Sequence, residues 1–550
     1  MAPFFLAALP AALLITGTRA TCADSSASCA SLLGTTFSEG TAVVHTAETI
    51  LNGSTFAGTS ANADYNEAQV SVPQACRLVL TVQTSNASSS SSAEAEVWLP
   101  PGAAWNGRLL TVGNGGFAGA VNYPDVIWGL RKGFASVSTD TGHMSNSSDG
   151  SFLSYPEQSV DWGHRALHLS VAAAKEAVSA YYNNEKNGTG SSGRLYSYYA
   201  GCSTGGRQGL NAAERYPEDF DGVLAGAVPW QTRVAGWQTY VALLQFPNTT
   251  ANHIPADKWP FVAAAVLDQC DLLDGAADGI IMDPSSCDID FDALTCSTGA
   301  LNATACLSDE QAANLKRMYD PWVSNGTLVH EGLSPSGEAS FSYLMNGDEP
   351  QFGPTWFRHA IFNDSSWDWA TLTAADVFFS DTINPGGANA HDPDLRAFEA
   401  RGSRLLHYHG YADPLIPSLS AAAFYDTVRD FYAGVGRDAD DVEDFYRLFM
   451  VPGMGHCSSG AGAWVLDAAS QGGAVPPVES DASDSLLYSL VDWVEGGSSA
   501  APESIIGTKY VEDTAPAVQF QRPICRWPAV AEYDGVGDVD DAESWSCPVV

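Results

Sequence analysis

The sequence predicts a protein of the α/β class, in which a parallel sheet is covered by helices on both faces. Three observations support this. Short β-type runs alternate with stretches of helical apolar spacing. The alternation is interrupted once, by a long region of different composition, and then resumes. The chain of 550 residues is 45% apolar and only 16% charged, which is typical of a globular protein with a large core.

The first half of the chain supplies most of the expected strands. Runs of branched and aromatic residues predict strands over 78–82, 95–99, 108–112, 134–138 and 195–200. The serine-rich run 88–92 between the first two indicates a hairpin loop. Helical spacing covers 162–182 and, after a glycine-rich turn, 206–215.

The rhythm is lost between residues 229 and 401, a region rich in Trp, Asp, Asn and Gly that holds four cysteines. We interpret it as an insertion that folds as a small domain of its own. Strands are expected again at 404–409 and 446–451, followed by a helix near 486–494. The α/β domain is therefore predicted in two parts, 21–228 and 402–550, on either side of the inserted domain 229–401.

Features of the whole chain predict export from the cell. Residues 1–20 are typical of a signal peptide, because the apolar stretch 4–15 is too short to span a bilayer and Ala20 offers a cleavage site. The chain has 11 cysteines, as expected in an oxidising compartment. Asn-x-Ser/Thr sequons predict a secreted, extracellular glycoprotein, and they lie at Asn52, Asn86, Asn146, Asn187, Asn248, Asn302, Asn325 and Asn363.

The net charge of -39 limits the partners that the protein can have. Phosphate groups are repelled by such a surface, so we expect no nucleic-acid partner and no membrane partner. The sequence leaves open whether the chain is a monomer or a homodimer.

The segment Gly201-Cys202-Ser203-Thr204-Gly205 matches the G-x-S-x-G pattern of a nucleophilic serine. A turn tight enough to raise a serine above a sheet needs small flanking residues. The alternative is an ordinary strand-to-helix turn. The expected strand before the motif and the helix after it favour Ser203 as the nucleophile, with the helix N-terminus favouring developing negative charge.

The order Ser, Asp, His of an α/β hydrolase selects the partners of this serine. Asp413 follows the strand 404–409 in a turn fixed by Pro414, and His456 lies in a glycine-broken loop after the strand 446–451. A turn-forming Asp and a loop His are the plain alternatives, but their joint order and spacing favour a triad of Ser203, Asp413 and His456. The prediction is an α/β-hydrolase fold with a large inserted lid domain.

An ester carbonyl attacked by Ser203 becomes an oxyanion that backbone N–H groups must hold. Thr204 supplies one of them, as the residue after the nucleophile. The second is expected from the glycine-rich loop after the strand 108–112, with Gly116 preferred and Gly115 as the alternative. Cys202 precedes the serine and Cys457 follows the histidine, so a real triad brings these two cysteines close enough for a disulfide. Two free thiols are the alternative.

Three segments together resemble the tannase and feruloyl esterase family, and feruloyl esterase B of fungi in particular. They are the segment 201–207 (GCSTGGR), the segment 409–414 (HGYADP) and the segment 453–457 (GMGHC). The resemblance extends over nearly the whole mature chain, including the loop 112–116. It implies a Cys202–Cys457 disulfide, a lid between the nucleophile and the acid, and hydrolysis of hydroxycinnamic or gallic acid esters.

The same resemblance implies a structural calcium ion, Ca²⁺, in the lid. The acidic stretch 270–280 offers oxygen ligands in a spacing that differs from an EF-hand. The implied ligands are the carboxylates of Asp271, Asp274 and Asp278 and the carbonyls of Ala276 and Ile280. A solvated acidic loop is the alternative.

Four further disulfides are implied by the resemblance: Cys270–Cys287, Cys296–Cys306, Cys525–Cys547 and Cys29–Cys76. Cys22 is then left over, and its state is open. Lys316-Arg317 resembles a dibasic processing site, although an exposed helix face explains the pair equally well.

We therefore expect a secreted serine carboxylic ester hydrolase that acts on ferulate-type esters, either small phenolic esters or feruloylated plant cell-wall polysaccharide. A tannase that hydrolyses galloyl esters is the closest alternative. A catalytically inert glycoprotein that binds phenolics or glycans is a third reading, against which the triad argues. A serine peptidase is disfavoured because nothing in the sequence indicates a site for a peptide terminus.

Overall fold

The computed structural model describes residues 28–58, 65–85, 90–182, 194–296, 306–471, 481–513 and 517–548. The expected signal peptide, Cys22 and the sequons at Asn86, Asn187 and Asn302 lie outside the described residues. Among the helices that are described, none combines the length and apolar character needed to cross a membrane.

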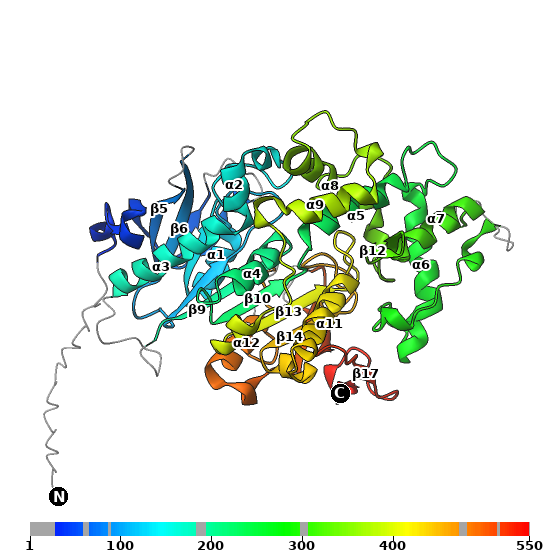
Figure 1. The fold of residues 1–550 in the computed structure, drawn as a ribbon. Helices are drawn as coiled ribbons and strands as arrows, with labels where there is room; N and C mark the ends of the chain where they lie inside the picture. Colours follow the sequence, from blue (N-terminus) through cyan, green and yellow to red (C-terminus); the bar gives the residue numbers. More distant parts are fainter. Residues whose placement is uncertain are drawn as a thin grey trace, which may run out of the picture.

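A ten-stranded sheet runs through the molecule in the order β1-β2-β5-β6-β8-β7-β9-β10-β13-β14 (Figure 1). From β8 to β14 neighbouring strands are parallel. The strands are β1 (Thr36–Phe37), β2 (Ala42–Ile50), β5 (Ala75–Ser85), β6 (Ser91–Leu99), β7 (Arg108–Val112), β8 (Ala135–Thr139), β9 (Tyr196–Cys202), β10 (Gly222–Gly226), β13 (Arg404–Gly410) and β14 (Tyr446–Val451). The α/β prediction is thus confirmed, and the bounds predicted for β7 and β14 agree with the structure.

The N-terminal part of the sheet differs from the prediction of a parallel sheet. Strands β1, β2, β5 and β6 pair antiparallel, and β6 joins β8 antiparallel as well. Only the residues between Ser85 and Ser91 connect β5 to β6, too few for the crossover that parallel strands require. Ser91 and Ser92 of the expected hairpin loop belong to β6 itself, and the segment 86–89 lies outside the described residues.

Helices cover both faces of the sheet, as predicted. Tyr198 and Tyr199 of β9 point to opposite faces, Tyr198 into a core shared with α1 and α12 and Tyr199 into a core shared with α4 and α11. The helix expected over 162–182 begins with a π-helical turn, Asp161–Arg165. The helices outside the inserted region are α1 (Tyr123–Arg131), α2 (Pro156–Val160), α3 (Ala166–Tyr182), α4 (Thr204–Arg215), α11 (Leu419–Gly434) and α12 (Leu486–Gly496).

The inserted region connects the parallel neighbours β10 and β13. Its helices α5 to α9 lie together on one side of the molecule, in green and yellow-green in Figure 1. Trp237, Trp259 and Phe341 belong to a hydrophobic core whose residues come almost all from this region. Its elements are α5 (Gln231–Leu243), α6 (Trp259–Cys270), α7 (Asp309–Tyr319), β11 (Trp322–Ser324), β12 (Thr327–His330), α8 (Gly353–Trp356), α9 (Ala374–Ile383) and α10 (Arg396–Ala400).

The C-terminal segment after α12 was not anticipated from the sequence. Two antiparallel pairs form there, β15 (Ser504–Tyr510) with β16 (Val518–Cys525) and β17 (Glu532–Tyr533) with β18 (Trp545–Ser546). Phe520 and Trp545 pack with Ala276 and Ile280 of the lid and with Ala463 of the loop that follows His456. The end of the chain therefore touches both the lid and the segment 452–471 that contains His456, here called the histidine loop. A further small pair, β3 (Ser54–Phe56) with β4 (Gln69–Val72), lies near the N-terminus.

Candidate active site

Ser203 is the single residue between strand β9 and helix α4. Its backbone has φ of 62° and ψ of -126°, a conformation that costs a non-glycine residue energy and that the surrounding structure must enforce. The Ser203 N–H donates to the Gly226 carbonyl oxygen at 3.0 Å. A Cβ atom on Gly206 would clash with that same oxygen, so the turn rests directly on β10 and requires glycine there.

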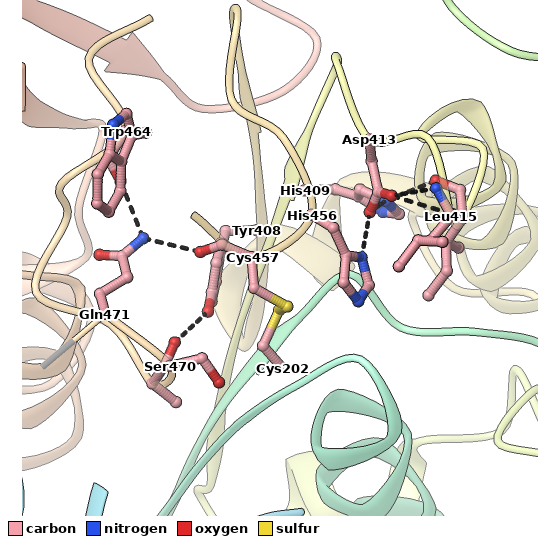
Figure 2. The surroundings of a disulfide bond; sticks show 12 residues. Cys202, Tyr408, His409, Asp413, Leu415, His456, Cys457, Trp464, Ser470 and Gln471 are labelled. Atoms are coloured by element: carbon pink, nitrogen blue, oxygen red, sulfur yellow. Dashed lines mark hydrogen bonds and ion pairs between the residues drawn. A yellow bond between two sulfur atoms is a disulfide. The ribbon is translucent and has the colours of Figure 1, made fainter. Parts of the chain in front are cut away.

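Asp413 and His456 come together beyond the ends of β13 and β14. Asp413 lies just beyond β13 and His456 just beyond β14, and Nδ1 of His456 lies 2.7 Å from Oδ2 of Asp413 (Figure 2). The other oxygen of Asp413 accepts the backbone N–H groups of Leu415, at 2.8 Å, and Ile416, at 3.0 Å. The sequence-predicted acid and base are thus in direct contact.

The surroundings of Asp413 keep it ionised. Burial by itself raises the pKa of this carboxyl, but the charge and hydrogen bond of His456 and the hydrogen bond of His409 outweigh burial and hold the pKa well below its usual range. Asp413 is fully buried, whereas the His456 side chain is 20% exposed. The imidazole therefore has one nitrogen on a buried negative charge and one edge toward solvent.

A disulfide between Cys202 and Cys457 ties the serine turn to the histidine loop (Figure 2). The two Cα atoms lie 5.9 Å apart. Because each cysteine is the chain neighbour of Ser203 or His456, the bond keeps those two residues at one place. The structure also joins the four other pairs that the family resemblance implies, Cys29–Cys76, Cys270–Cys287, Cys296–Cys306 and Cys525–Cys547.

Ser203 and His456 open into a shared cavity of about 320 Å³. Phe117, Phe352 and Val234 give it apolar walls, and its described lining residues include no Asp, Glu, Lys or Arg. Its remaining lining residues are Gly115, Gly116, Ser147, Cys202, Thr204, Pro229, Gln231, Gln238, Leu415, Ile416, Cys457, Ser458 and Ser470. An apolar cavity with a few placed polar groups is typical of a small-molecule site.

The structure bears on the choice between the two glycines left open as oxyanion donors. The Gly115 N–H donates to the Tyr65 hydroxyl oxygen at 2.7 Å, so that group is already engaged. Gly116 has φ of 53° and lines the cavity together with Thr204, the first residue of α4. Of the two glycines, Gly116 is therefore the better candidate to act as an oxyanion donor together with Thr204.

Side chains that the sequence analysis did not single out hold the histidine loop in shape. Gln471 is fully buried, and its amide oxygen accepts the N–H groups of Leu466 and Ala468. Its amide nitrogen donates to the carbonyls of Cys457, at 3.0 Å, and Trp464, at 2.9 Å (Figure 2). The only signal in the sequence is a polar residue at the end of the mostly apolar stretch 463–471.

Asn122 and Asp125, which the sequence analysis also did not single out, link the glycine-rich loop 112–116 to the histidine loop. The Asn122 amide donates to the Gly113 carbonyl at 2.9 Å and to Asp125 at 2.9 Å. Asp125 in turn accepts the Ser470 N–H at 3.1 Å. Burial raises the pKa of Asp125 to about 6. These bonds connect the glycine-rich loop at Gly113 to the segment at Ser470.

The acidic lid loop fits a cation in part. Among the described residues, no three His, Cys, Asp or Glu side chains are placed to hold a metal by themselves. Asp274 nevertheless has a buried oxygen, Oδ2, without a hydrogen-bond partner. Desolvation raises the pKa of Asp274 to about 6, and the nearby carboxylates Asp278 and Asp271 add to the increase. Asp278 is paired with Arg522, but Asp271 and Asp274 have no Lys or Arg partner among the described ion pairs, so two of the three carboxylates are left for a cation and backbone carbonyls to complete.

The acidic loop also contacts the C-terminal segment. The Arg522 guanidinium donates to Oδ2 of Asp278 at 2.8 Å and lies 3.8 Å from the centre of the Trp545 ring. Ala276 and Ile280 are buried beside it. The acidic loop of the lid therefore packs directly against the end of the chain.

Comparisons with known proteins agree over most of the chain. The family described as "Tannase and feruloyl esterase" matches residues 76–548. "Probable feruloyl esterase B-1" of Aspergillus flavus is 34% identical over 482 residues, which are 87% of either chain. The "Probable feruloyl esterase B-1" of Neosartorya fischeri is 34% identical over 486 residues, 88% of either chain.

Solved structures give the same picture. The crystal structure of feruloyl esterase B from Aspergillus oryzae superposes with a TM-score of 0.83 at 31% identity, covering 92% of this chain and 97% of the other. Tannin acyl hydrolase from Aspergillus niger has a TM-score of 0.73 at 20% identity, covering 94% of each chain. That second likeness is one of fold. Together these structures confirm the predicted α/β-hydrolase architecture.

Proposed function

Because this chain belongs to the tannase and feruloyl esterase family and is a carboxylic ester hydrolase, we propose that it cleaves hydroxycinnamic acid esters of the ferulate type with Ser203, His456 and Asp413. The observation that carries the proposal is the contact of 2.7 Å between His456 and Asp413 at a cavity that also holds Ser203.

The first half of the reaction acylates Ser203. His456 has Nδ1 on Asp413, so its Nε2 is the nitrogen that takes the Ser203 hydroxyl proton as the oxygen attacks the ester carbonyl. The backbone N–H groups of Thr204 and Gly116 hold the oxyanion of the tetrahedral intermediate. His456 then gives the proton to the alkoxide as the C–O bond breaks, and the alcohol leaves.

The second half returns the enzyme to its starting state. Water gives a proton to His456 and adds to the acyl carbon, and the same N–H groups hold the second oxyanion. The bond to Ser203 breaks as His456 returns the proton to the serine oxygen, and the free carboxylic acid departs. Asp413 keeps its charge throughout and stabilises the imidazolium in both halves.

The lining of the cavity favours a feruloyl over a galloyl acyl group. A galloyl ring carries three adjacent hydroxyls that lose water on entry, and each needs a hydrogen-bond partner. A feruloyl group has one hydroxyl, a methoxy group and an apolar spacer. The cavity offers the rings of Phe117 and Phe352 as apolar walls. Its polar side chains other than Ser203 and His456 are the amides of Gln231 and Gln238, of which Gln238 already donates to the Leu415 carbonyl at 3.0 Å, and the hydroxyls of Ser147, Thr204, Ser458 and Ser470.

Side-by-side kinetics on methyl ferulate, methyl caffeate and methyl gallate test this assignment. We expect kcat/KM for ferulate to exceed that for gallate by about tenfold or more, since each unpaired buried hydroxyl costs roughly 1–3 kcal/mol. A preference for gallate would overturn the acyl class in favour of a tannase. Labelling of Ser203 by an organophosphonate, followed by peptide mapping, tests the nucleophile independently of the acyl group.

We also infer that the lid loop binds Ca²⁺ as a structural ion. Asp271, Asp274 and Asp278 would hold it together with the carbonyls of Ala276 and Ile280. The ion supplies charge compensation for these carboxylates, and no step at Ser203 involves it. The buried, unpaired oxygen of Asp274 supports this assignment.

Secretion of a glycosylated chain completes the proposal. All five sequon asparagines that the structure describes are exposed, which N-glycosylation requires; they are Asn52, Asn146, Asn248, Asn325 and Asn363. The natural substrate is then a small phenolic ester or a feruloylated polysaccharide met outside the cell. A mobility shift after endoglycosidase treatment of protein from the culture medium, with N-terminal sequencing to locate the cleavage near Ala20, tests both points.

A further inference from the structure

A second histidine, His409, contacts the triad carboxylate from the interior of the protein (Figure 2). It lies near the end of β13 and is fully buried. We propose that His409 is a positioning residue for Asp413, to which it donates an N–H that fixes the orientation of the carboxylate and moderates its basicity toward His456. This inference rests on the proposed triad and goes beyond it.

The protonation of His409 follows from its contacts. Its Nε2 lies 3.2 Å from Oδ2 of Asp413 and 3.1 Å from the Ile416 carbonyl oxygen. Both of these neighbours accept hydrogen bonds and neither can donate, so the ring proton is on Nε2. The other ring nitrogen, Nδ1, is buried without a partner among the described residues, where a proton would be an unpaired buried donor.

His409 closes a small ring of hydrogen bonds around the Asp413 turn. The Ile416 N–H donates to Oδ1 of Asp413, while the Ile416 carbonyl accepts from His409. Oδ2 then receives His409 and His456 together. With the Leu415 N–H also on Oδ1, both carboxylate oxygens are held, so the carboxylate cannot turn away from His456.

The N–H of His409 also acts on the chemistry of the pair. A carboxylate that already accepts several hydrogen bonds has its negative charge partly compensated, so it attracts the proton on His456 less strongly. Without His409, Asp413 would attract the His456 imidazolium more strongly. The imidazolium would then give up its proton less readily. The acid limb of the kcat/KM profile, which reports the base in the free enzyme, would then move to higher pH.

The other titratable groups that face His409 are neutral. His407, on the same strand, has its ring centre 6.4 Å from that of His409, and burial lowers its pKa to about 3. His330 of β12 faces it from the lid, and burial lowers the pKa of His330 as well. The ionised neighbour of His409 is therefore Asp413.

Two substitutions at this position test the role of the N–H. In His409→Gln the amide nitrogen stands the same number of bonds from Cα as Nε2 and can donate to Asp413. His409→Met has similar length and no donor. We expect the Met variant to lose about 10- to 100-fold in kcat with KM nearly unchanged and to show an acid limb at higher pH. We expect the Gln variant to stay within about threefold of the parent, with the parent's pH profile.

The matched control is His407→Met, which removes an equally buried histidine of the same strand that contacts Tyr446 instead of Asp413. It is expected to lower the melting temperature without moving the acid limb. A parental kcat and acid limb in His409→Met, or equal losses in the Met and Gln variants, would overturn the proposal. If the Met variant does not fold, His409→Asn, whose amide is one methylene too short to reach Asp413, takes its place.

The failure of this inference and the failure of the proposed function can be told apart with Ser203→Ala. An active Ser203→Ala enzyme would overturn the triad and His409 with it. An inactive Ser203→Ala enzyme combined with an unaffected His409→Met enzyme would overturn the role of His409 alone.

Discussion

Ser203 and His456 meet at one cavity, yet the chain holds them in different ways. The backbone fixes Ser203 between a strand and a helix, with its N–H on Gly226 and a glycine packed beneath. His456 lies in a loop. Its position is fixed by the disulfide of the neighbouring Cys457 to Cys202, by a hydrogen bond to Asp413 and by the bonds of Gln471. The serine depends on local backbone geometry, and the histidine depends on contacts with distant residues.

This difference separates two kinds of damage. A change in the serine turn disturbs strands and a helix, so it affects folding and activity together. A change in the contacts of the histidine loop leaves the sheet intact and displaces the base, so activity falls more than stability. Misplacement by as little as 1 Å is enough to slow a proton transfer strongly.

The largest expected effect comes from removing the nucleophile without disturbing its turn. Ser203→Ala should lower kcat by about 10⁴-fold or more while the melting temperature stays near the parent value. Steady-state hydrolysis and a thermal melt measure the two quantities. Gly206→Ala is the contrasting variant, because its Cβ clashes with Gly226, and it should yield little folded protein. A Ser203→Ala enzyme with near-native activity would show that the nucleophile is elsewhere.

The next effect comes from the bond that joins the two regions. Cys202→Ala combined with Cys457→Ala should reduce kcat about 10- to 100-fold, because the base loses its tether to the serine turn. The chain-entropy estimate of about 4–5 kcal/mol is an upper value for the stability lost, since other disulfides constrain the same loop.

A distant pair provides the control for this variant. Cys29→Ala with Cys76→Ala should lower the melting temperature and leave kcat near the parent value, because this bond lies at the N-terminal edge of the sheet. Mass spectrometry of a non-reduced digest should find the Cys202 and Cys457 peptides linked. Free thiols at both positions in active enzyme would contradict the tether.

A smaller effect is expected from Gln471. Gln471→Met leaves two buried N–H groups and two carbonyls in the histidine loop without partners, so we expect kcat to fall about 3- to 30-fold along with the melting temperature. Asn314→Leu removes an equally buried amide that bonds backbone carbonyls of the lid, and it should lower stability alone. Equal changes in kcat for the two variants would show that the loop needs no such support.

The smallest expected effect on catalysis follows calcium removal. In the free loop the pKa of Asp274 is raised to about 6, above its unfolded value, so the folded protein binds this proton more tightly and loses stability as the pH rises from about 4 to about 6. Bound Ca²⁺ removes that loss. The gain in melting temperature on adding Ca²⁺ to chelated enzyme should therefore increase over this range.

The control variants isolate the loop from the rest of this acidic protein. Asp274→Asn should abolish most of the calcium-dependent gain, whereas Asp290→Asn, on the neighbouring segment, should keep it. The kcat of chelated enzyme should stay close to that of the loaded enzyme at temperatures well below the melt. An immediate, reversible loss of activity at unchanged melting temperature would argue that the ion acts in catalysis.

What the sequence predicted follows the same division. Strands β7 and β14 were predictable because runs of branched and aromatic residues are a local signal, and the turn at Ser203 was predictable from the glycines that flank it. Asp413 and His456 were predictable because an α/β hydrolase orders its triad along the chain. These signals place each residue of the proposed triad in the chain but say nothing about what packs around it.

The contacts of those residues were not predictable for a physical reason. His409 meets Asp413 through a turn, Gln471 bonds four backbone groups across its loop, and Tyr65 reaches Gly115 from the distant N-terminal segment. The Gln471 and Tyr65 contacts have no periodic signature, because a single side chain can meet the backbone from any direction. His409 and Asp413 are four residues apart in the segment 409–414, but that spacing alone does not say that the two side chains meet. The cavity at Ser203 and His456 was not predictable for the same reason, since its walls come from the sheet edge and the inserted region together.

The lid occupies the place of a single crossover. Strands β10 and β13 are parallel neighbours, with Gly222 opposite Arg404 and Gly226 opposite Tyr408, and the whole insertion forms the link between them. In evolutionary terms a crossover can lengthen without shifting the register of the strands that it joins. Because α5, at the start of this link, contributes Gln231, Val234 and Gln238 to the cavity, related chains can exchange specificity by replacing the link while inheriting the triad unchanged.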